Sequence, residues 1–212
     1  MFKKILPPLI LFLFLTGCVR LVSQPTVGNK PAADSGTANK NMSNKKILMV
    51  IAPRDFRDAE YNEPRAVFDA NGLPVEVASI QSGQSIGAEG TVVKIDLTIS
   101  EVNVLAYGAV VFVGGPGMAE IVSDESLQVL AKKFYQANKI TAAICVAPAI
   151  LAYAGILDGK QATAWSGVKG ELIKAGAKFI DEPVVRDENI ITANGPSAAR
   201  AFGEAIAKAL AE

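Results

Sequence analysis

The sequence has 212 residues and a mass of 22.2 kDa; half of its residues are hydrophobic, and 21 basic residues balance 21 acidic ones. This length suffices for one domain with an appended segment. The sequence contains no histidine, which excludes Ser-His-Asp and Cys-His catalysis within one chain and every zinc site that needs an imidazole ligand. Any catalysis must therefore use carboxylates, a thiol, lysine or backbone amides.

Residues 1–17 have the parts of a secretory signal: two lysines near the start, an apolar run of roughly ten residues, and small residues at the end. The apolar run is too short for a lasting transmembrane helix, which needs about 20 residues. Residues 15–18 (LTGC) resemble the bacterial lipobox, in which cleavage leaves an acylated cysteine as the first residue. We therefore expect an exported lipoprotein, anchored through Cys18 on the periplasmic side or outer face of the cell envelope. An uncleaved anchor and a chance cysteine are the alternatives, and both still export the chain.

Residues 18–44 are mostly small and polar and show no apolar period, so we interpret them as a flexible tether. The globular part is expected over residues 45–212, where 16 basic and 20 acidic residues form no basic cluster. This charge pattern gives no electrostatic footprint for nucleic acid. Attachment to a membrane would depend on the lipid at Cys18 instead.

Beyond the tether, short apolar runs alternate with amphipathic stretches, which favours strands alternating with helices. Strands are expected at residues 46–52, 74–80, 109–113, 140–144, 161–164, 182–185 and 190–193, with an extended segment or hairpin arm at 91–99. Helices are expected at residues 59–70, 123–136 (with Ser123 as N-cap), 147–154, 168–174 and 196–210. The alternation predicts an α/β fold with a mostly parallel sheet covered by helices on both faces.

In such a sheet, function gathers where the carboxyl ends of strands meet the N-termini of helices. Three predicted loops converge there, at residues 53–60, 114–118 and 145–148. Cys145 stands between a buried strand and a helix, where a sharp turn exposes a nucleophile and the helix N-terminus lowers its pKa. Residues 114–117 lack the spacing of a nucleotide-binding loop, so we interpret them as a turn with exposed amides. No cluster of metal ligands is present, and we expect neither a metal nor a cofactor.

Several segments, taken in order from residue 45 to the end, resemble the DJ-1/ThiJ/PfpI superfamily. They are FRDAE at residues 56–60 followed by Pro64, VGG at 113–115, AICVAP at 143–148 with Leu151 and Gly155, LDGK at 157–160, and DENIITANGP at 187–196. A lone cysteine would be weak support, whereas this ordered set is specific. The resemblance implies a flavodoxin-like three-layer sandwich and a homodimer.

The resemblance also implies a catalytic pair, namely a reactive Cys145 at the turn and an acidic Glu60 from the first loop. A carboxyl group packed against a thiolate is pushed toward its neutral form and can then donate a hydrogen bond to the sulfur. The backbone amides of Gly115 and Val146 would form an oxyanion hole, and Gly114 would give the space for this approach in the pocket.

The chain departs from the family pattern at three positions. Val146 stands where protease-like members have a histidine, and Trp165 is expected in the corner where other members place one. Asn194 stands where some members have an arginine that helps to bind anions. Because no histidine can pass a proton to an amine leaving group, peptidase activity is not expected, and Glu60 must do all acid-base work.

Each candidate residue also has a purely structural interpretation. Cys145 could be a small buried hydrophobe, Glu60 a solvated residue in the first turn of a helix, and Trp165 a packing aromatic rather than a pocket wall. Asp58 is interpreted as a loop charge and a partner of the helix dipole, as are Asp55 and Glu63.

Two functional hypotheses remain. The favoured one is an enzyme that uses Cys145 and Glu60 on a small reactive carbonyl or related electrophile, as in the glyoxalase-, deglycase- and hydratase-like members of the family. The alternative is a non-enzymatic envelope protein that senses oxidants or holds other proteins. With Cys18 lipidated, Cys145 would be the only thiol left and could be oxidised to the sulfenic or sulfinic acid.

Overall fold

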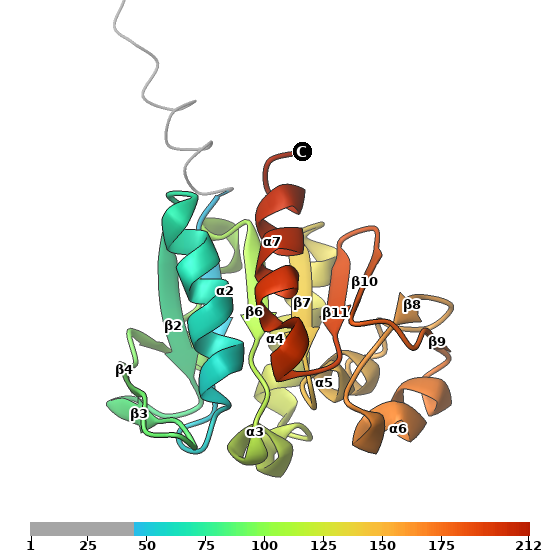
Figure 1. Ribbon diagram of the computed structural model, residues 1–212, viewed down its shortest axis with the longest axis horizontal. Helices are drawn as coiled ribbons and strands as arrows, with labels where there is room; N and C mark the ends of the chain where they lie inside the picture. Colours follow the sequence, from blue (N-terminus) through green and yellow to red (C-terminus); the bar gives the residue numbers. More distant parts are fainter. Residues whose placement is uncertain (1–44) are drawn as a thin grey trace, which may run out of the picture. The chain divides into compact units, whose positions relative to one another are not determined.

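The computed structural model describes residues 45–212 (Figure 1). The predicted signal peptide, Cys18 and the tether lie outside the described residues. The centre of the described part is a seven-stranded sheet with the order β10-β11-β7-β6-β1-β2-β5. Its strands are β1 (Ile47–Val50), β2 (Val75–Ser79), β5 (Leu97–Thr98), β6 (Ala109–Phe112), β7 (Ile140–Ile144), β10 (Val184–Asp187) and β11 (Ile190–Ala193).

All neighbouring strands of this sheet run parallel except β10, which pairs antiparallel with β11. Helices α2 (Asp58–Ala70) and α7 (Ala199–Ala209) cover one face, and α4 (Glu125–Gln136) and α5 (Pro148–Tyr153) cover the other (Figure 1). This arrangement confirms the predicted flavodoxin-like sandwich with a mostly parallel sheet. Short parallel strands such as β1 are buried on both faces, which explains their nearly uninterrupted apolar sequence.

Smaller elements complete the described chain. They are the antiparallel pair β3 (Gln84–Ile86) and β4 (Val92–Lys94), the parallel pair β8 (Gln161–Ala162) and β9 (Lys178–Phe179), the helices α3 (Pro116–Ile121) and α6 (Lys169–Lys174), and the 3-10 turns Ile99–Glu101, Val104–Ala106, Ser166–Val168 and Pro196–Ala198. Within residues 45–212 no helix has the length and apolar character needed to cross a membrane.

The sheet separates two hydrophobic clusters because successive side chains of a strand point to opposite faces. Ile47 of β1 belongs to the cluster under α2 and α7, together with Phe68 and Phe202. The next residue, Leu48, belongs to the cluster under α4 and α5, together with Phe134. Burial on both faces therefore fixes the register of β1 relative to its neighbouring strands. The register in turn fixes the position of the loop that follows β1.

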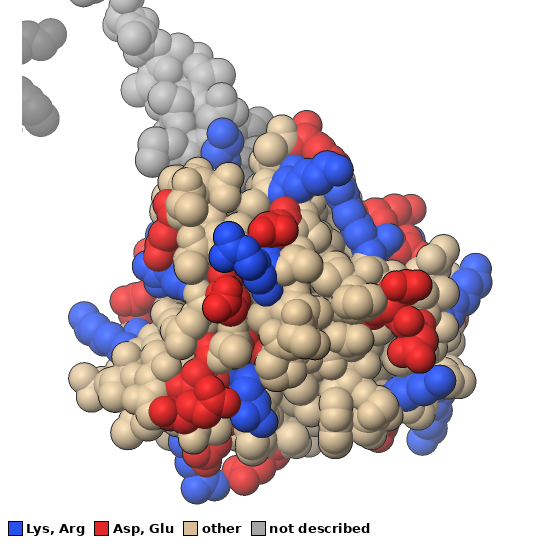
Figure 2. All heavy atoms as spheres, viewed as in Figure 1, with Lys and Arg blue, Asp and Glu red and all other residues tan. Residues whose placement is uncertain are grey.

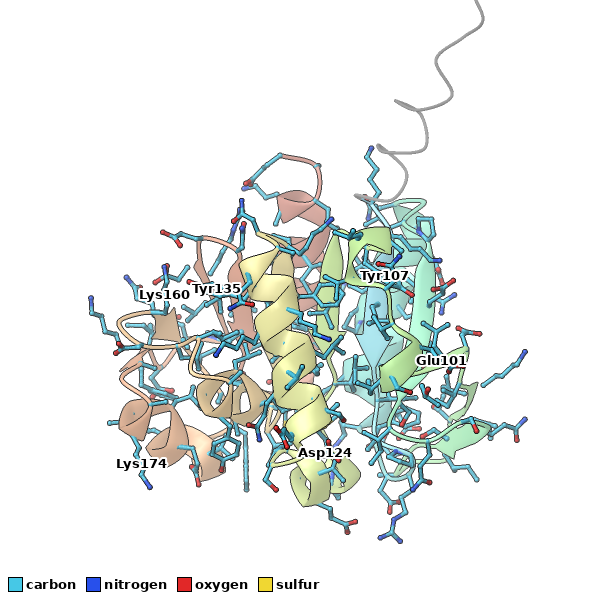
Figure 3. All side chains as sticks on the ribbon, turned by 180° about the vertical axis from the view of Figure 1, so that it is seen from behind. Glu101, Tyr107, Asp124, Tyr135, Lys160 and Lys174 are labelled. Atoms are coloured by element: carbon cyan, nitrogen blue, oxygen red, sulfur yellow. The ribbon has the colours of Figure 1, made fainter. Side chains whose placement is uncertain are left out.

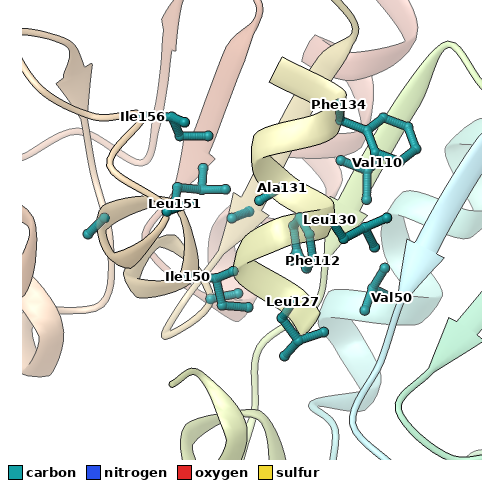
Figure 4. Packing of buried hydrophobic residues seen from close by; sticks show 14 of the residues in the cluster. Val50, Val110, Phe112, Leu127, Leu130, Ala131, Phe134, Ile150, Leu151 and Ile156 are labelled. Atoms are coloured by element: carbon teal, nitrogen blue, oxygen red, sulfur yellow. The ribbon is translucent and has the colours of Figure 1, made fainter. Parts of the chain in front are cut away.

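Helix α4 buries one apolar stripe against the sheet (Figure 4). Leu127, Leu130, Ala131 and Phe134 repeat at helical spacing, and all four are buried as the sequence predicted. The N-cap, however, is Asp124, whose side chain accepts a hydrogen bond from the Ser126 amide at 2.8 Å. The prediction of Ser123 as N-cap was therefore wrong by one residue, since both side chains can cap and only the packed register selects between them.

The amino ends of the central strands are joined by a polar cluster that includes Tyr107, labelled in Figure 3. The Tyr107 hydroxyl donates to Glu76, and Lys46 forms an ion pair with the same carboxylate. The Lys46 ammonium also lies 5.4 Å from the centroid of the Tyr107 ring. These contacts tie β1, β2 and the residues before β6 together at the end of the sheet opposite to the predicted functional loops.

Acidic and basic side chains are interspersed on the face shown in Figure 2. Several of them form exposed pairs, for example Arg65 with Asp69 at 2.9 Å and Arg200 with Glu204 at 3.3 Å. Exposed pairs of this kind contribute little to stability, about 0 to 1 kcal/mol.

Helices α2 and α7 pack closely against each other at Gly203. A Cβ atom at Gly203 would lie 2.8 Å from the Cα atom of Pro64, so alanine forces the two helices apart. We expect Gly203→Ala to lower the free energy of unfolding by about 1 to 3 kcal/mol, as overpacking does elsewhere, measured by urea denaturation.

The matched control is Gly170→Ala in α6, where no heavy atom lies within 4 Å of the added methyl group. Alanine is the better helix former, so this variant should be unchanged or more stable by up to about 1 kcal/mol. Equal effects of the two substitutions would contradict the proposed contact.

Candidate active site

Cys145 lies at a sharp turn between the end of β7 and the start of α5, at the carboxyl edge of the sheet. Its φ of 64° is in the left-handed region, which is unfavourable for a residue with a side chain. Two backbone hydrogen bonds hold this conformation: the Cys145 amide donates to Ala193 at 2.9 Å, and the Cys145 carbonyl accepts from Trp165 at 2.8 Å. The sharp turn predicted at Cys145 is therefore present, and hydrogen bonds fix it from both sides.

Glu60 approaches Cys145 from the first turn of α2. Its side chain is fully buried, and its Oε2 accepts a hydrogen bond from the Gly114 amide at 3.0 Å. A Cβ at Gly114 would lie 2.5 Å from Glu60 Oε2 and 2.7 Å from the Cβ of Cys145. Only glycine can therefore separate the acid from the thiol at this position, which gives Gly114 a steric role beneath the site.

A second acidic residue, Asp58, fixes the start of the same helix. Its two carboxylate oxygens accept hydrogen bonds from the backbone amides of Glu89 at 2.8 Å and Thr91 at 2.7 Å. Asp58 is only 4% exposed, so its interpretation as a loop charge was incomplete. It clamps the loop after β3 against the first turn of α2 and thereby limits the movement of Glu60.

The amides of Gly115 and Val146 both point toward the Cys145 sulfur. Neither amide donates to a backbone carbonyl in residues 45–212, so both are available to a negative charge at this point. Gly115 has a φ of 111°, and a Cβ there would lie 2.3 Å from the backbone nitrogen of Arg57. The backbone conformation that directs this amide into the site thus requires glycine.

Burial dominates the protonation of the pair. It raises the pKa of Glu60 from its ordinary value of 4.5 to about 7, against the opposing hydrogen bonds of Cys145 and Gly114. Burial likewise raises the pKa of Cys145 to about 12, and the negative charge of an ionised Glu60 adds to this rise. The amides of Val146 and Gly115 lower the pKa of this thiol, but desolvation and the neighbouring carboxylate outweigh them, so the net direction is upward.

The protonation state of Glu60 therefore controls the thiol. A protonated Glu60 carries no charge and can donate a hydrogen bond to the sulfur, so its own contribution to the raised pKa of Cys145 is removed or reversed, while the effect of burial remains. The second carboxyl oxygen, Oε1, is buried and has no hydrogen-bond partner in the described part of the chain. A neutral carboxyl group is the form that such an environment favours.

A cavity of about 300 Å³ opens above Cys145. Its lining residues are Arg57, Gly115, Pro116, Ala119, Cys145, Val146, Trp165 and Pro196. Trp165 is 49% exposed and lines the cavity, so it is not a core aromatic. Gly114 is not among the residues that line the cavity and lies beneath it, between Glu60 and Cys145.

Sequence reasoning missed part of this cavity. Pro116 and Ala119 belong to α3, a helix that was interpreted as a turn because its six residues show no apolar period. Pro196 was assigned only to a helix start, and Arg57 was noted in the FRDAE segment without a role. Within residues 45–212 no group of three or more Cys, Asp or Glu side chains is placed to hold a metal ion.

Comparison with known proteins agrees with this architecture. A profile of the DJ-1/PfpI family matches residues 45–209. An uncharacterized protein of Methanocaldococcus jannaschii is 45% identical over 195 residues, which are 91% of this chain and 95% of that protein. A deglycase of Pyrococcus horikoshii is 34% identical over 152 residues, covering 72% of this chain and 91% of the relative.

Among solved structures, a ThiJ/PfpI domain protein from Brachyspira murdochii superposes with a TM-score of 0.77 at 36% identity. The match covers 79% of this chain and 96% of that structure. The fold and the site define an α/β protein with a cysteine at a sharp strand-to-helix turn and a buried acid beside it. The chain belongs to the DJ-1/PfpI family, as its motifs predicted.

The raised pKa of Glu60 predicts a pH-dependent stability. A carboxyl group whose pKa is higher in the native state stabilises that state below its unfolded pKa, and this stability is lost as the pH rises through the native pKa. For a shift from 4.5 to about 7, the native protein should lose roughly 2 to 3 kcal/mol between pH 5 and pH 8. Urea denaturation at both pH values measures this loss.

Glu60→Gln should abolish this part of the pH dependence. The control is Glu63→Gln on the same helix, because the Glu63 side chain is 49% exposed and should leave the pH dependence as in the native protein. A Glu60→Gln variant that loses as much stability as the native protein between the two pH values would disprove the assignment.

Proposed function

We propose that the protein is an enzyme in which the Cys145 thiolate adds to a small reactive carbonyl compound. The observation that carries the proposal is the arrangement of Glu60, Gly114 and Cys145, in which a buried acid and a thiol approach each other across a residue that can only be glycine. A merely structural cysteine does not need a strained turn or a buried unpaired carboxyl oxygen beside it. Membership of a family that includes proteins named as deglycases supports this chemistry.

The first chemical step follows from the contacts around the sulfur. Protonated Glu60 stabilises the thiolate, which attacks the carbonyl carbon, so that a carbon–sulfur bond forms and the π electron pair moves to the oxygen. The amides of Gly115 and Val146 stabilise this oxyanion. Glu60 then transfers its proton to the oxygen, giving a thiohemiacetal and a carboxylate that can act as the base of the next step. The pKa of Glu60, about 7, suits both roles near neutral pH.

The cavity favours small substrates. Its volume of about 300 Å³ is at the lower end for ligand pockets, and most of its walls are apolar side chains and glycine. The site also contains no histidine to protonate an amine leaving group, since the chain has none. The proposed activity is therefore addition to carbonyl compounds, in the manner of a glyoxalase, deglycase or hydratase, and not peptide hydrolysis.

Replacement of the nucleophile tests this proposal. We expect Cys145→Ser to lower the turnover of methylglyoxal and glyoxal by at least about a hundredfold, since a serine hydroxyl is far less acidic than a thiol and Glu60 is too weak a base to ionise it. Loss of substrate, followed by its absorbance, measures the rate. The control is Ser79→Ala: Ser79 is buried and its hydroxyl has no partner in the described residues, so this variant should keep its activity.

Unchanged turnover in Cys145→Ser would contradict the enzymatic proposal. If the native protein turns over neither substrate while mild peroxide adds oxygen to Cys145, the result would favour the alternative of an envelope redox sensor.

We also propose that the mature chain is anchored to a membrane by lipid on Cys18, which rests on the LTGC segment at residues 15–18. Cys18→Ser should then move the protein expressed in bacteria from the detergent phase to the aqueous phase of a Triton X-114 partition. Cys145→Ser is the matched control and should remain in the detergent phase. Equal partition of both variants would contradict the lipid anchor.

A further inference from the structure

Arg57 is the one charged side chain among the residues that line the cavity above Cys145. It immediately precedes α2, one turn before Glu60, and it lines the cavity together with the apolar Pro116, Ala119 and Trp165. A positive charge beside a mostly apolar pocket favours a ligand that carries negative charge.

The backbone of Arg57 is held firmly against the site. Its amide donates to the Gly114 carbonyl at 3.0 Å, and the preceding carbonyl of Phe56 accepts from the Ala88 amide at 2.9 Å. The neighbouring Asp58 clamps the same loop through two further amides. Arg57 is therefore placed by the same contacts that place Glu60 and the amide of Gly115, which is the preorganisation that selective binding requires.

The guanidinium group keeps most of its hydrogen-bonding capacity. In the described residues it makes a single side-chain hydrogen bond, from Nη1 to Glu89 Oε1 at 3.0 Å. Glu89 is 58% exposed, so this ion pair lies at the surface, where such pairs are weak. A guanidinium group has five N–H donors in a planar fork that matches a carboxylate, and four of them remain for a ligand.

The charges at the reacting centre make such a cation necessary for an anionic substrate. The Cys145–Glu60 pair carries one negative charge when it is active, whether as thiolate or as carboxylate, and this charge repels an incoming anion. Arg57 offsets that repulsion, since it lies close enough to Glu60 for their charges to interact.

We propose that Arg57 binds a carboxylate next to the reacting carbonyl, so that the preferred substrates are small 2-oxo carboxylates. This inference rests on the proposed function, because Cys145 remains the nucleophile. The addition step is the one described for the proposed function. The sulfur–carbon bond forms, the carbonyl π electron pair moves to the oxygen, and Glu60 supplies the proton. The substrate carboxylate neither gains nor loses a bond and stays paired with Arg57.

Two alkylating reagents test the proposal without a known substrate. Iodoacetate and iodoacetamide deliver the same carbon to Cys145 and both release iodide, but only iodoacetate carries a carboxylate. The ratio of their rate constants on the full chain, followed by mass spectrometry of the Cys145 peptide, reports carboxylate recognition at the sulfur. Because both reagents use the same thiolate, any change in the pKa of Cys145 cancels from this ratio.

We expect Arg57→Gln to lower the iodoacetate-to-iodoacetamide ratio at least tenfold, and Arg57→Lys to retain part of it. The matched control is Arg54→Gln: Arg54 lies three residues earlier, pairs with Glu120 at 2.9 Å on the surface, and does not line the cavity. Its ratio should stay within twofold of that of the native protein. The kcat/KM ratio of glyoxylate to methylglyoxal should fall in parallel with the alkylation ratio in Arg57→Gln.

The outcomes separate this proposal from the proposed function. A native-like ratio in Arg57→Gln, or an equal fall in Arg54→Gln, would overturn the role of Arg57 while leaving the nucleophile intact. If the iodoacetate-to-iodoacetamide ratio falls in Arg57→Gln but the glyoxylate-to-methylglyoxal ratio does not, Arg57 does not select the substrate and the proposal is overturned. A Cys145 that reacts with neither reagent would refute the nucleophile itself, and both proposals with it.

Discussion

A carboxyl group buried beside a thiol is the constraint around which the site is built. Glu60 is fully removed from water, and within residues 45–212 the one backbone amide that donates to its side chain is that of Gly114, at 3.0 Å. Its ionised form is therefore expensive, and the group becomes a proton carrier near neutral pH. The same proximity links the two groups, because each change in the charge of Glu60 alters the free energy of the Cys145 thiolate.

Holding that arrangement requires a scaffold with little freedom. The left-handed turn at Cys145 is fixed by hydrogen bonds from β11 and from the segment before α6, and the start of α2 is clamped by Asp58. Both turns leave a sheet whose strands are locked by two hydrophobic clusters. The local strain at Cys145 is thus supported by the burial of the whole sheet, which is how strained functional residues persist in stable proteins.

The absence of histidine gives this member of the family a simpler set of acid-base groups. Val146 and Trp165 both line the cavity, and neither can take part in proton transfer. Among the described residues, the pocket is lined mostly by apolar side chains, with Arg57 as its one charged residue; Glu60 is buried beside Cys145 and does not line it. Specificity in such a pocket depends on charge and size, because few polar groups are available to recognise a substrate in other ways.

The α/β class, the order of most elements and the candidate pair Cys145 and Glu60 could be predicted from the sequence alone. Strands buried on both faces are apolar throughout, and the family motifs are short runs of neighbouring residues, so both can be recognised without the structure. The sequence did not determine the helix α3, the N-cap Asp124 or the strand β9, since these are short elements whose conformation depends on tertiary packing. The rise in the pKa of Cys145 and the position of Arg57 at the cavity could be found only from the three-dimensional structure. Both follow from distances between residues far apart in the chain, for which no local pattern exists.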